Sequence, residues 1–364
     1  MDKQREIRKL EHLEQALKTE NGPLSSGWKD LHLVHQALLK NNLDEIDTSV
    51  TLFQKKLKLP LLINAMTGGA EGLTTINRTL AEIACEYKLG MAVGSQTAGL
   101  NRQALAGTYK VAREVNPQGF LLANVSAGVK PELALAAVEM IEADALQLHL
   151  NGVQELTMDE GDRTFQGWAE NIEKICQFVP VPVIVKEVGN GISREMAAQL
   201  AGLGVKGIDT GGSGGTNFAT IELSRSKREN LAFLRSWGIS SALSLLEVSA
   251  GTLNLKQATS VPLIIASGGI THSTQIVKAL ALGADAVGIA GSFLRELINN
   301  GEKALREKIN HLSEELKVMM LLLGAQNIAE IREVPVVITG FTREWCEQRG
   351  IDVKKYAQRK RENC

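Results

Sequence analysis

The sequence has little excess charge of either sign. Its 364 residues contain 40 Lys and Arg against 41 Asp and Glu, which gives a formal net charge of −1. Proteins that bind nucleic acid or an anionic membrane usually carry a clear basic excess. The charge balance therefore argues against both kinds of partner, and any basic site must be local.

Cysteine is scarce, and its spacing shows no pattern. The four cysteines, at positions 85, 176, 346 and 364, form no CxxC pair and no metal-type spacing. Such usage fits a reducing compartment better than a disulfide framework. We therefore expect a cytoplasmic protein.

Long apolar runs are also missing. No segment approaches the ~20 apolar residues that a membrane span needs, and the start of the chain lacks the apolar core of a signal peptide. We expect a soluble, unprocessed chain, whose length is compatible with two average domains or with one large α/β barrel.

From about Leu59 onward, short apolar runs that end in Gly or polar residues alternate with segments of helical spacing. Such alternation indicates a parallel sheet covered by helices on both faces. The predicted strands are 60–69, 90–96, 119–128, 144–151, 181–189, 205–212, 261–269 and 284–291. The clearest predicted helices are 74–87, 131–141, 165–178 and 273–281, and a further helix is predicted at 302–323.

Eight such units favour a closed (β/α)8 TIM barrel in the α/β class. An open doubly wound sheet normally has fewer strands and a GxGxxG motif near its start, which this chain lacks. We predict an N-terminal extension over 1–58 with a charged helix, a barrel over 59–323, and a C-terminal helical tail over 324–364. Within this tail, 334–339 is a short apolar run, and the basic end is expected to be solvated surface.

A long insertion, 213–240, follows the sixth predicted strand. Loops of this length in compact domains are usually lids or mobile segments.

Function in a barrel sits at the carboxyl ends of its strands. Glycine-rich turns at 267–270 and 288–291 follow the last two strands, where barrels usually bind phosphate through backbone N–H groups. The alternative is a pair of ordinary glycine turns, but their position at these two strands favours phosphate. The loop 211–218, in which Thr216 can form hydrogen bonds, is a third candidate contact for the phosphate.

The stretch QLHLNGVQE ends the fourth strand with several polar groups. Gln147, His149 and Asn151 share one face of the strand. Glu155 could hold Mg²⁺ together with substrate phosphates, although nearby acidic residues at 159, 160 and 162 compete for that role. His149 has no second His or Cys at ligand spacing, which argues against zinc.

Lys186 ends the fifth strand, at the mouth of the predicted barrel. It could form a Schiff base, hold a negatively charged ring or phosphate, or pair with Glu187, and this position alone does not decide. Near the N-terminus, Arg8, Lys9 and His12 lie within one helical turn. They could clamp a diphosphate, but neighbouring glutamates make a solvated helix face the better interpretation of this segment alone.

The motifs MTGG, GSQ, HLNxxQE, VKEVG, GGxGGTNF, SGG and AG, with RKxxH at the start, occur in this order along the chain. In this respect the sequence resembles the type 2 isopentenyl-diphosphate isomerases, flavoproteins with an FMN-bearing TIM barrel. The resemblance implies interconversion of isopentenyl and dimethylallyl diphosphate in isoprenoid biosynthesis. It also implies Mg²⁺, FMN reduced by NADPH or an equivalent, and a homo-oligomer, tetrameric or octameric.

The resemblance also implies roles for individual residues, with Gln154 and His149 assigned to catalysis. The flavin ring and ribityl chain would contact Ala65, Met66, Thr67, Ser95, Asn124, Lys186 and Thr216. The flavin phosphate would contact Gly268, Gly269, Ala290 and Gly291. The substrate would contact Arg8, Lys9, Ser95, Gln96, His149, Asn151 and Gln154, and Glu155 would bind Mg²⁺. Gly211 stands where the family often has Ser, so that contact is left out.

Moving a double bond requires one proton to be added and another removed, and no pair of side chains at the strand ends is placed for both. A reduced flavin would supply this chemistry, with Lys186 as its electrostatic partner. Gln154 would orient the alkene or relay a proton.

The main alternative is an FMN-dependent oxidoreductase of the 2-hydroxy-acid or dihydroorotate type. It would need a His base beside an Arg late in the barrel, where His272 stands alone. A cysteine-dependent nucleotide dehydrogenase is disfavoured because Cys85 lies in a helical pattern and Cys176 precedes the fifth strand. A non-catalytic scaffold would leave the polar cluster at 149–155 without a purpose.

Overall fold

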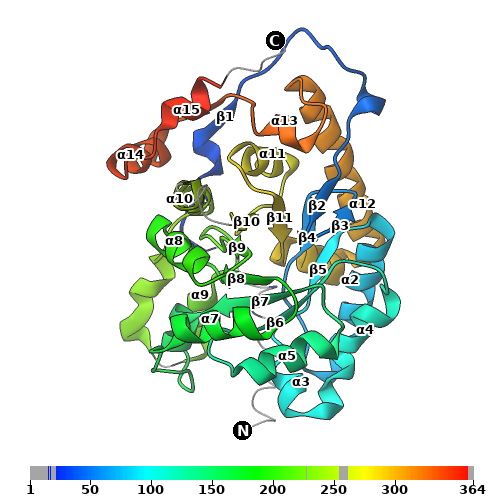
Figure 1. Cartoon of the computed structure of the whole chain (residues 1–364), viewed down its shortest axis with the longest axis vertical. Coiled ribbons are helices and arrows are strands. Elements are labelled where there is room, and N and C mark those ends of the chain that lie inside the picture. The colour runs from blue at the N-terminus through cyan, green and yellow to red at the C-terminus, as the bar shows by residue number, and fades with distance from the viewer. Residues whose placement is uncertain (1–14, 16, 18–21, 227, 254–260, 360–364) are drawn as a thin grey trace.

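The centre of the molecule is a closed barrel of eight parallel strands (Figure 1). The computed structural model describes residues 15, 17, 22–226, 228–253 and 261–359. Each of the eight predicted strand segments contains one barrel strand, so the (β/α)8 prediction is confirmed. The strands are β4 (Leu61–Ile63), β5 (Gly90–Ala92), β6 (Leu121–Ser126), β7 (Ala145–Leu150), β8 (Val183–Glu187), β9 (Gly207–Asp209), β10 (Leu263–Ser267) and β11 (Ala286–Ile289).

Helices cover the outside of the barrel. Two of them, α2 (Thr74–Tyr87) and α11 (Ser273–Ala281), match their predicted bounds. α7 (Trp168–Phe178) begins three residues later than expected, because Gly167 before it adopts a left-handed conformation with φ 86°. The other helices of this layer are α4 (Gly107–Val115), α5 (Pro131–Met140), α8 (Arg194–Gly202) and α10 (Ser241–Leu253). Two short helices, α3 (Thr97–Asn101) and α6 (Gly152–Thr157), contribute residues to the cavity at the carboxyl ends of the strands.

The lower half of the barrel interior is apolar. Side chains from the strands, among them Leu62, Leu122 and Ile184, form a cluster with Leu52 and Leu57. The last two belong to a hairpin of β2 (Val50–Leu52) and β3 (Lys55–Leu57), part of the predicted N-terminal extension. The hairpin therefore supplies apolar side chains that close the amino-terminal end of the barrel.

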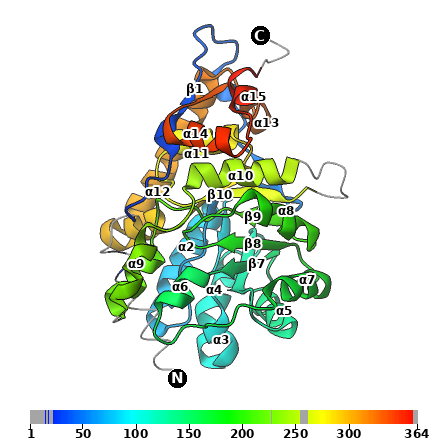
Figure 2. The same cartoon turned by 90° about the vertical axis from the view of Figure 1, so that its left-hand side faces the viewer.

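The two ends of the chain meet in a second small sheet. β1 (Leu31–Leu33) pairs antiparallel with β12 (Val336–Ile338), so the predicted C-terminal tail contains a strand as well as helices. The side chain of Asp30 accepts hydrogen bonds from the backbone and the hydroxyl of Thr342. Figure 2 shows β1 with α14 (Gly340–Gln348) and α15 (Val353–Ala357) above α10 and α11.

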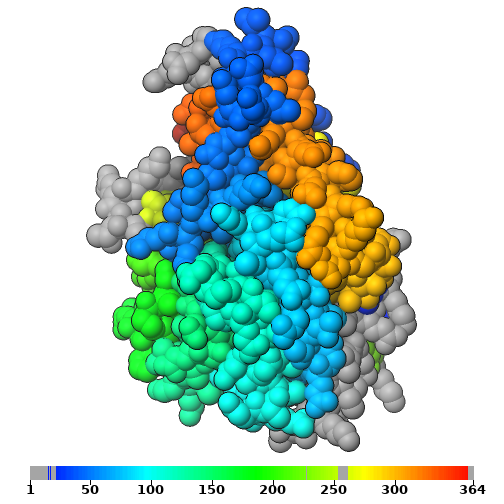
Figure 3. All heavy atoms as spheres, turned by 90° about the vertical axis from the view of Figure 1, so that its right-hand side faces the viewer, coloured from blue at the N-terminus to red at the C-terminus, as the bar shows by residue number. Residues whose placement is uncertain are grey.

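One apolar cluster joins all three predicted segments. It contains Trp28 of the extension, the helices around the barrel, and Ile338 of the tail. Figure 3 shows the described part of the extension lying beside α12 (Gly291–Leu322), where the backbone of Gln36 bonds to the carbonyl of Leu322. The three predicted segments thus share one apolar core, and their bounds at 58 and 323 stay a prediction.

The C-terminal region differs from expectation in two places. The predicted helix at 302–323 is the second half of α12, which breaks at Gly301 with φ 86°. The basic end was expected to be solvated, but Tyr356 is only 8% exposed and the Arg359 guanidinium lies 4.7 Å from its ring centroid. That expectation was wrong for Tyr356 and Arg359, because α15 packs Tyr356 against the core, whereas Lys354, Lys355 and Gln358 are exposed as expected. α13 (Ile328–Ile331) precedes β12.

The insertion after β9 is helical rather than a structureless loop. It forms α9 (Phe218–Arg225) and a 3-10 helix, η5 (Glu229–Ser236). α9 begins where the side chain of Asn217 accepts a hydrogen bond from the backbone of Thr220, as a capping residue does. The remaining 3-10 turns are η1 (Trp28–Asp30), η2 (Leu43–Glu45), η3 (Glu71–Leu73) and η4 (Gln103–Leu105).

Among the described residues, no helix has both the length and the apolar character that crossing a bilayer would require.

The apolar lower layer should contribute strongly to stability. Phe120 is 2% exposed there and its ring centroid lies 6.4 Å from that of Phe53. We expect Phe120→Ala to lower the free energy of unfolding by about 3–5 kcal/mol, because the substitution leaves a cavity. The control is Phe178→Ala at the end of α7, where the ring is 47% exposed, and the expected loss is below about 1 kcal/mol. Equal losses in denaturant titrations would contradict the assignment of Phe120 to the core.

Candidate functional site

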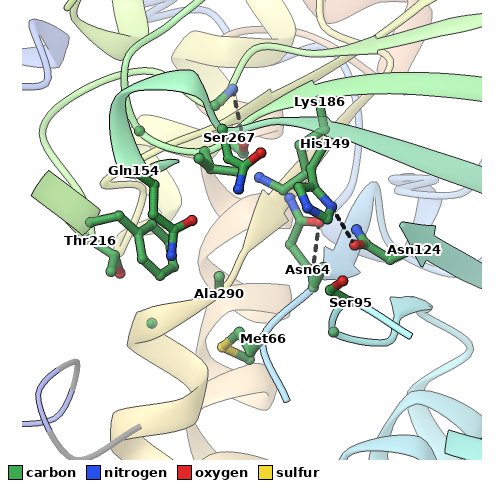
Figure 4. Close-up of a pocket in the computed structure, with 18 of the residues that line it drawn as sticks. Asn64, Met66, Ser95, Asn124, His149, Gln154, Lys186, Thr216, Ser267 and Ala290 are labelled. Carbon is green, nitrogen blue, oxygen red and sulfur yellow. Dashed lines mark hydrogen bonds between the residues drawn. The ribbon is translucent and has the colours of Figure 1, made fainter. Parts of the chain in front are cut away.

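A cavity of about 820 Å³ opens at the carboxyl ends of the barrel strands (Figure 4). Its volume lies within the range of ~300–1,000 Å³ that is usual for small-molecule sites. Every barrel strand contributes, since the residues that line the cavity include Asn64, Gly94, Asn124, His149, Lys186, Gly211, Ser267 and Gly288. The polar strand ends that are scattered along the sequence are thus brought to one place.

Most residues predicted from the sequence line this cavity. They are Ala65, Met66, Thr67, Ser95, Asn124, His149, Asn151, Gln154, Glu155, Lys186, Thr216, Gly268, Gly269, Ala290 and Gly291. The predicted substrate contacts Arg8 and Lys9 lie outside the described residues, as does His12.

Gln96 is the exception. Its side chain is fully buried and is absent from the cavity lining. The amide oxygen accepts a hydrogen bond from the backbone of Asn124 at 2.9 Å, and the amide nitrogen donates to the carbonyl of Ala137 at 2.9 Å. The prediction that Gln96 contacts substrate is therefore corrected, because its amide holds β5 and β6 together with α5.

The predicted phosphate turns form a tightly packed backbone cradle. Gly268 and Gly269 have φ of 105° and 66°, and a Cβ on Gly269 would lie 2.2 Å from the carbonyl oxygen of Gly214. No side chain fits between these two loops, so backbone alone faces the cavity there. Gly291 begins α12 beside them, and a helix N-terminus attracts anions.

Arg295 lies one helical turn beyond Gly291 and also lines the cavity. Burial lowers the pKa of its guanidinium from the ordinary value. The sequence analysis did not single it out, although its spacing of four residues from Gly291 places it on the same helix face. A cation close to the glycine cradle suits a phosphate group.

Gln154 on α6 is held by the insertion. Its amide nitrogen donates to a carboxylate oxygen of Glu222 at 2.9 Å, and the other oxygen of Glu222 pairs with Arg225 at 2.7 Å. Glu222 is 1% exposed. The sequence analysis missed Glu222, whose available signal was a carboxylate three residues before an arginine on one helix face.

Glu155 is positioned by its neighbours. One carboxylate oxygen accepts from the side-chain amide of Asn151 at 2.8 Å and the other from the backbone of Asp162 at 2.9 Å. The amide oxygen of Asn151 is buried and has no hydrogen-bond partner among the described residues. Among all the residues that the structure describes, no three His, Cys, Asp or Glu side chains are grouped as a metal site. A cation at Glu155 would therefore need oxygen ligands from a substrate or from water.

Several known proteins are similar to this chain in sequence. The profile of the FMN-dependent dehydrogenase family matches residues 105–337. An isopentenyl-diphosphate delta-isomerase of Symbiobacterium thermophilum is 47% identical over 342 residues, covering 93% of this chain and 92% of its own length. The corresponding enzyme of Listeria monocytogenes is 44% identical over 358 residues, with 98% of both chains covered. The chain belongs to the isopentenyl-diphosphate delta-isomerase family.

Solved structures with low sequence identity share the fold. A mandelate oxidase structure has a TM-score of 0.64 at 16% identity, covering 90% of this chain and 94% of its own. A flavocytochrome b2 structure has a TM-score of 0.65 at 16% identity, covering 89% and 82%. At this identity the likeness shows the fold alone.

The cavity of this isomerase-family chain has features that fit a flavin mononucleotide. The glycine cradle and Arg295 suit the phosphate, and Lys186 offers a cation to the electron-rich part of a ring. The ammonium of Lys186 donates to the carbonyl oxygen of Glu187 at 2.8 Å, which fixes its position at the strand end. The carboxylate of Glu187 instead accepts from the backbone of Gly189 and Asn190.

Glu187 should make stability depend on pH. Burial raises the pKa of its carboxyl to about 7 from an ordinary 4.5, although backbone N–H groups oppose this shift. The Glu187 carboxylate therefore binds a proton more tightly in the folded chain than in the unfolded chain. The contribution of Glu187 to the free energy of unfolding is therefore fully present below about pH 4.5 and is lost as the pH rises through about 7.

We expect Glu187→Gln to remove this loss, because glutamine stays neutral at every pH. The stability of the variant relative to the parent should rise between pH 5 and pH 8, by at most about 3 kcal/mol. Thermal melts at both pH values measure this, with exposed Glu170→Gln as the control. An unchanged difference would mean that Glu187 is ionised throughout.

Proposed function

We propose that the protein interconverts isopentenyl diphosphate and dimethylallyl diphosphate in isoprenoid biosynthesis. The proposal is carried by 47% identity, over 93% of this chain, to an enzyme of that name. FMN, reduced by NADPH or an equivalent, and Mg²⁺ on the diphosphate are its cofactors. The cavity supports this through its glycine cradle and its polar rim at Asn151, Gln154 and Glu155.

Interconversion moves a carbon–carbon double bond, so a proton must reach one carbon and leave another. Reduced FMN supplies both the proton donor and the proton acceptor when bound. The protein would hold the phosphate of FMN at Gly268, Gly269, Ala290 and Gly291. Its ring and ribityl chain would lie against Ala65, Met66, Thr67, Ser95, Asn124, Lys186 and Thr216, with Lys186 stabilising negative charge on the ring.

Gln154 orients the alkene end of the substrate or relays a proton to it. The hydrogen bond to Glu222 fixes which end of its amide faces α9, and Arg225 in turn fixes the Glu222 carboxylate. A side chain held in this way needs no reorganisation when the substrate binds, which is the condition for efficient positioning.

The diphosphate end is bound beside Gln154, by residues at the start of α6 and within it. Glu155 holds Mg²⁺, and Asn151, whose side-chain amide donates to Glu155, contacts the substrate. Ser95 and His149 contact the substrate, and Arg8 and Lys9 of the N-terminal segment complete the diphosphate site.

The alternative is an FMN-dependent oxidoreductase of the 2-hydroxy-acid or dihydroorotate type, whose fold is the same. Such an enzyme would need a base late in the barrel beside Arg295. His272, the candidate from the sequence, is absent from the cavity lining, and the described residues after β10 and β11 that do line it offer no carboxylate or imidazole. This observation favours the isomerase.

A cytoplasmic location and a tetrameric or octameric assembly stay predictions. The location is supported by the three cysteines within the described residues, Cys85, Cys176 and Cys346, which are free thiols. The net charge of −1 is the observation that argues against a nucleic-acid or anionic-membrane partner.

An anaerobic assay tests the function. Purified protein with isopentenyl diphosphate, Mg²⁺ and FMN should form dimethylallyl diphosphate with dithionite present and none without it. Absence of product in both conditions, with FMN bound, would favour the oxidoreductase, and flavin reduction by hydroxy acids would then be measured.

Shortening Gln154 tests its role. We expect Gln154→Asn to lower kcat by about 10²-fold or more with little change in KM, because positioned proton transfer typically contributes 10²–10⁴. The matched control is Gln166→Asn at an exposed position outside the cavity, which should leave both constants unchanged. Unchanged kcat in Gln154→Asn would remove Gln154 from the mechanism.

A further inference from the structure

A layer of buried polar side chains lies between the apolar lower layer and the cavity. Its five members lie in or directly after five different barrel strands, and none is more than 4% exposed. They are Asn64, Asn124, Gln147, Asp209 and Ser267. Gln147 and Asp209 do not line the cavity, so ligand contact does not explain them. Burial of such groups is costly unless each hydrogen bond is made with the right polarity.

One end of the layer has a fixed polarity. The carboxylate of Asp209 can only accept, and it does so from the amide nitrogen of Asn64 at 2.7 Å and from the hydroxyl of Ser267. The amide oxygen of Asn64 also accepts from the backbone N–H of Ala65 at 2.9 Å. A backbone N–H can only donate, so two independent groups set the same orientation for Asn64.

This polarity passes along the layer. The amide nitrogen of Gln147 donates to the oxygen of Asn64 at 3.1 Å, which turns the oxygen of Gln147 toward Asn124. The amide nitrogen of Asn124 donates to that oxygen at 3.1 Å. The oxygen of Asn124 therefore faces His149, at 2.9 Å from its Nδ1 (Figure 4).

We infer that the chain Asn64, Gln147 and Asn124, anchored at Asp209 and at the backbone of Ala65, holds His149 with a proton on Nδ1. An amide oxygen can only accept, so Nδ1 must donate in every protonation state. The neutral ring then carries its lone pair on Nε2, and Nε2 is the only ring nitrogen that gains or loses a proton. Gln147 is the positioning residue at the centre of this chain.

A consequence for catalysis rests on the proposed function. A diphosphate oxygen is an acceptor, so Nε2 must be protonated to donate to it. His149 would therefore bind the diphosphate in its imidazolium form, with Nε2 as the hydrogen-bond donor. Among the described residues, the charged groups near this arrangement include Lys186, opposite His149 in the β7–β8 register, Glu155 on α6, and Asp209 at the far end of the amide chain.

Nitrogen NMR of the purified flavin-loaded protein tests the inference. Histidine labelled with ¹⁵N gives separate signals for protonated and bare ring nitrogens, and loss of one set in His149→Asn assigns that residue among the six histidines. At pH ~9, where an ordinary imidazole with a pKa near 6.5 is neutral, we expect His149 to show a protonated Nδ1 and a bare Nε2. The opposite pattern would overturn the inference without any variant.

Gln147→Leu interrupts the chain without adding charge. We expect it to abolish the single Nδ1-protonated pattern, because the amide of Asn124 can then turn over. Gln96→Leu is the matched control: it removes another fully buried amide that bonds to the backbone of the same asparagine, outside the chain. Retention of the pattern in Gln147→Leu, or equal loss in both folded variants, would contradict the role of Gln147.

Inorganic pyrophosphate with Mg²⁺ separates this inference from the proposed function. On its addition to the parent protein, both ring nitrogens of His149 should become protonated. If the free protein shows the Nδ1-protonated pattern and pyrophosphate changes nothing, the hydrogen-bond chain stands and the diphosphate role of His149 fails. If the free protein lacks the pattern, the hydrogen-bond chain itself fails, whatever the anaerobic assay gives.

Discussion

Closure of the parallel sheet is the constraint on which the rest of the structure depends. The pairing of β4 with β11, in which Leu61 lies opposite Val287 and Ile63 opposite Ile289, joins the first and last barrel strands. Closure leaves no free sheet edge and sends every strand end to one rim. Loops that are more than 200 residues apart in sequence thereby become neighbours around a single cavity.

The barrel interior satisfies two opposite demands in two layers. Below, apolar strand residues and the β2–β3 hairpin exclude water, as a packed core requires. Above, amides and one carboxylate occupy the same inward-facing register. That upper layer is tolerated because its members hydrogen-bond to one another, and a satisfied buried network is rigid. The floor of the cavity is thus a polar surface of fixed hydrogen-bond direction.

Segments outside the barrel strands complete the rim. α6 presents Gln154, while α9 of the insertion presents the carboxylate that holds it. The insertion therefore contributes a residue that positions a side chain of the site. Since Gln154 and Glu222 lie 68 residues apart, this contact exists only when α6 and α9 are packed together.

The sequence by itself determined the positions of the eight strands, the bounds of α2 and α11, and the residues at the strand ends. These follow from local patterns, because an apolar run such as 119–128 or a helical spacing such as 74–87 specifies its element without distant partners. Motifs at strand ends then placed most of the site, since a barrel brings those ends together.

Only the tertiary structure decided which polar groups face one another. It turned Gln96 away from the cavity and paired Glu222 with Gln154. It also buried Tyr356 and joined β1 to β12 across the whole length of the chain. Each of these depends on long-range packing and on the direction of a side chain, which local periodicity does not encode. The sequence thus specified the elements and the strand-end chemistry, while the closed fold specified the contacts.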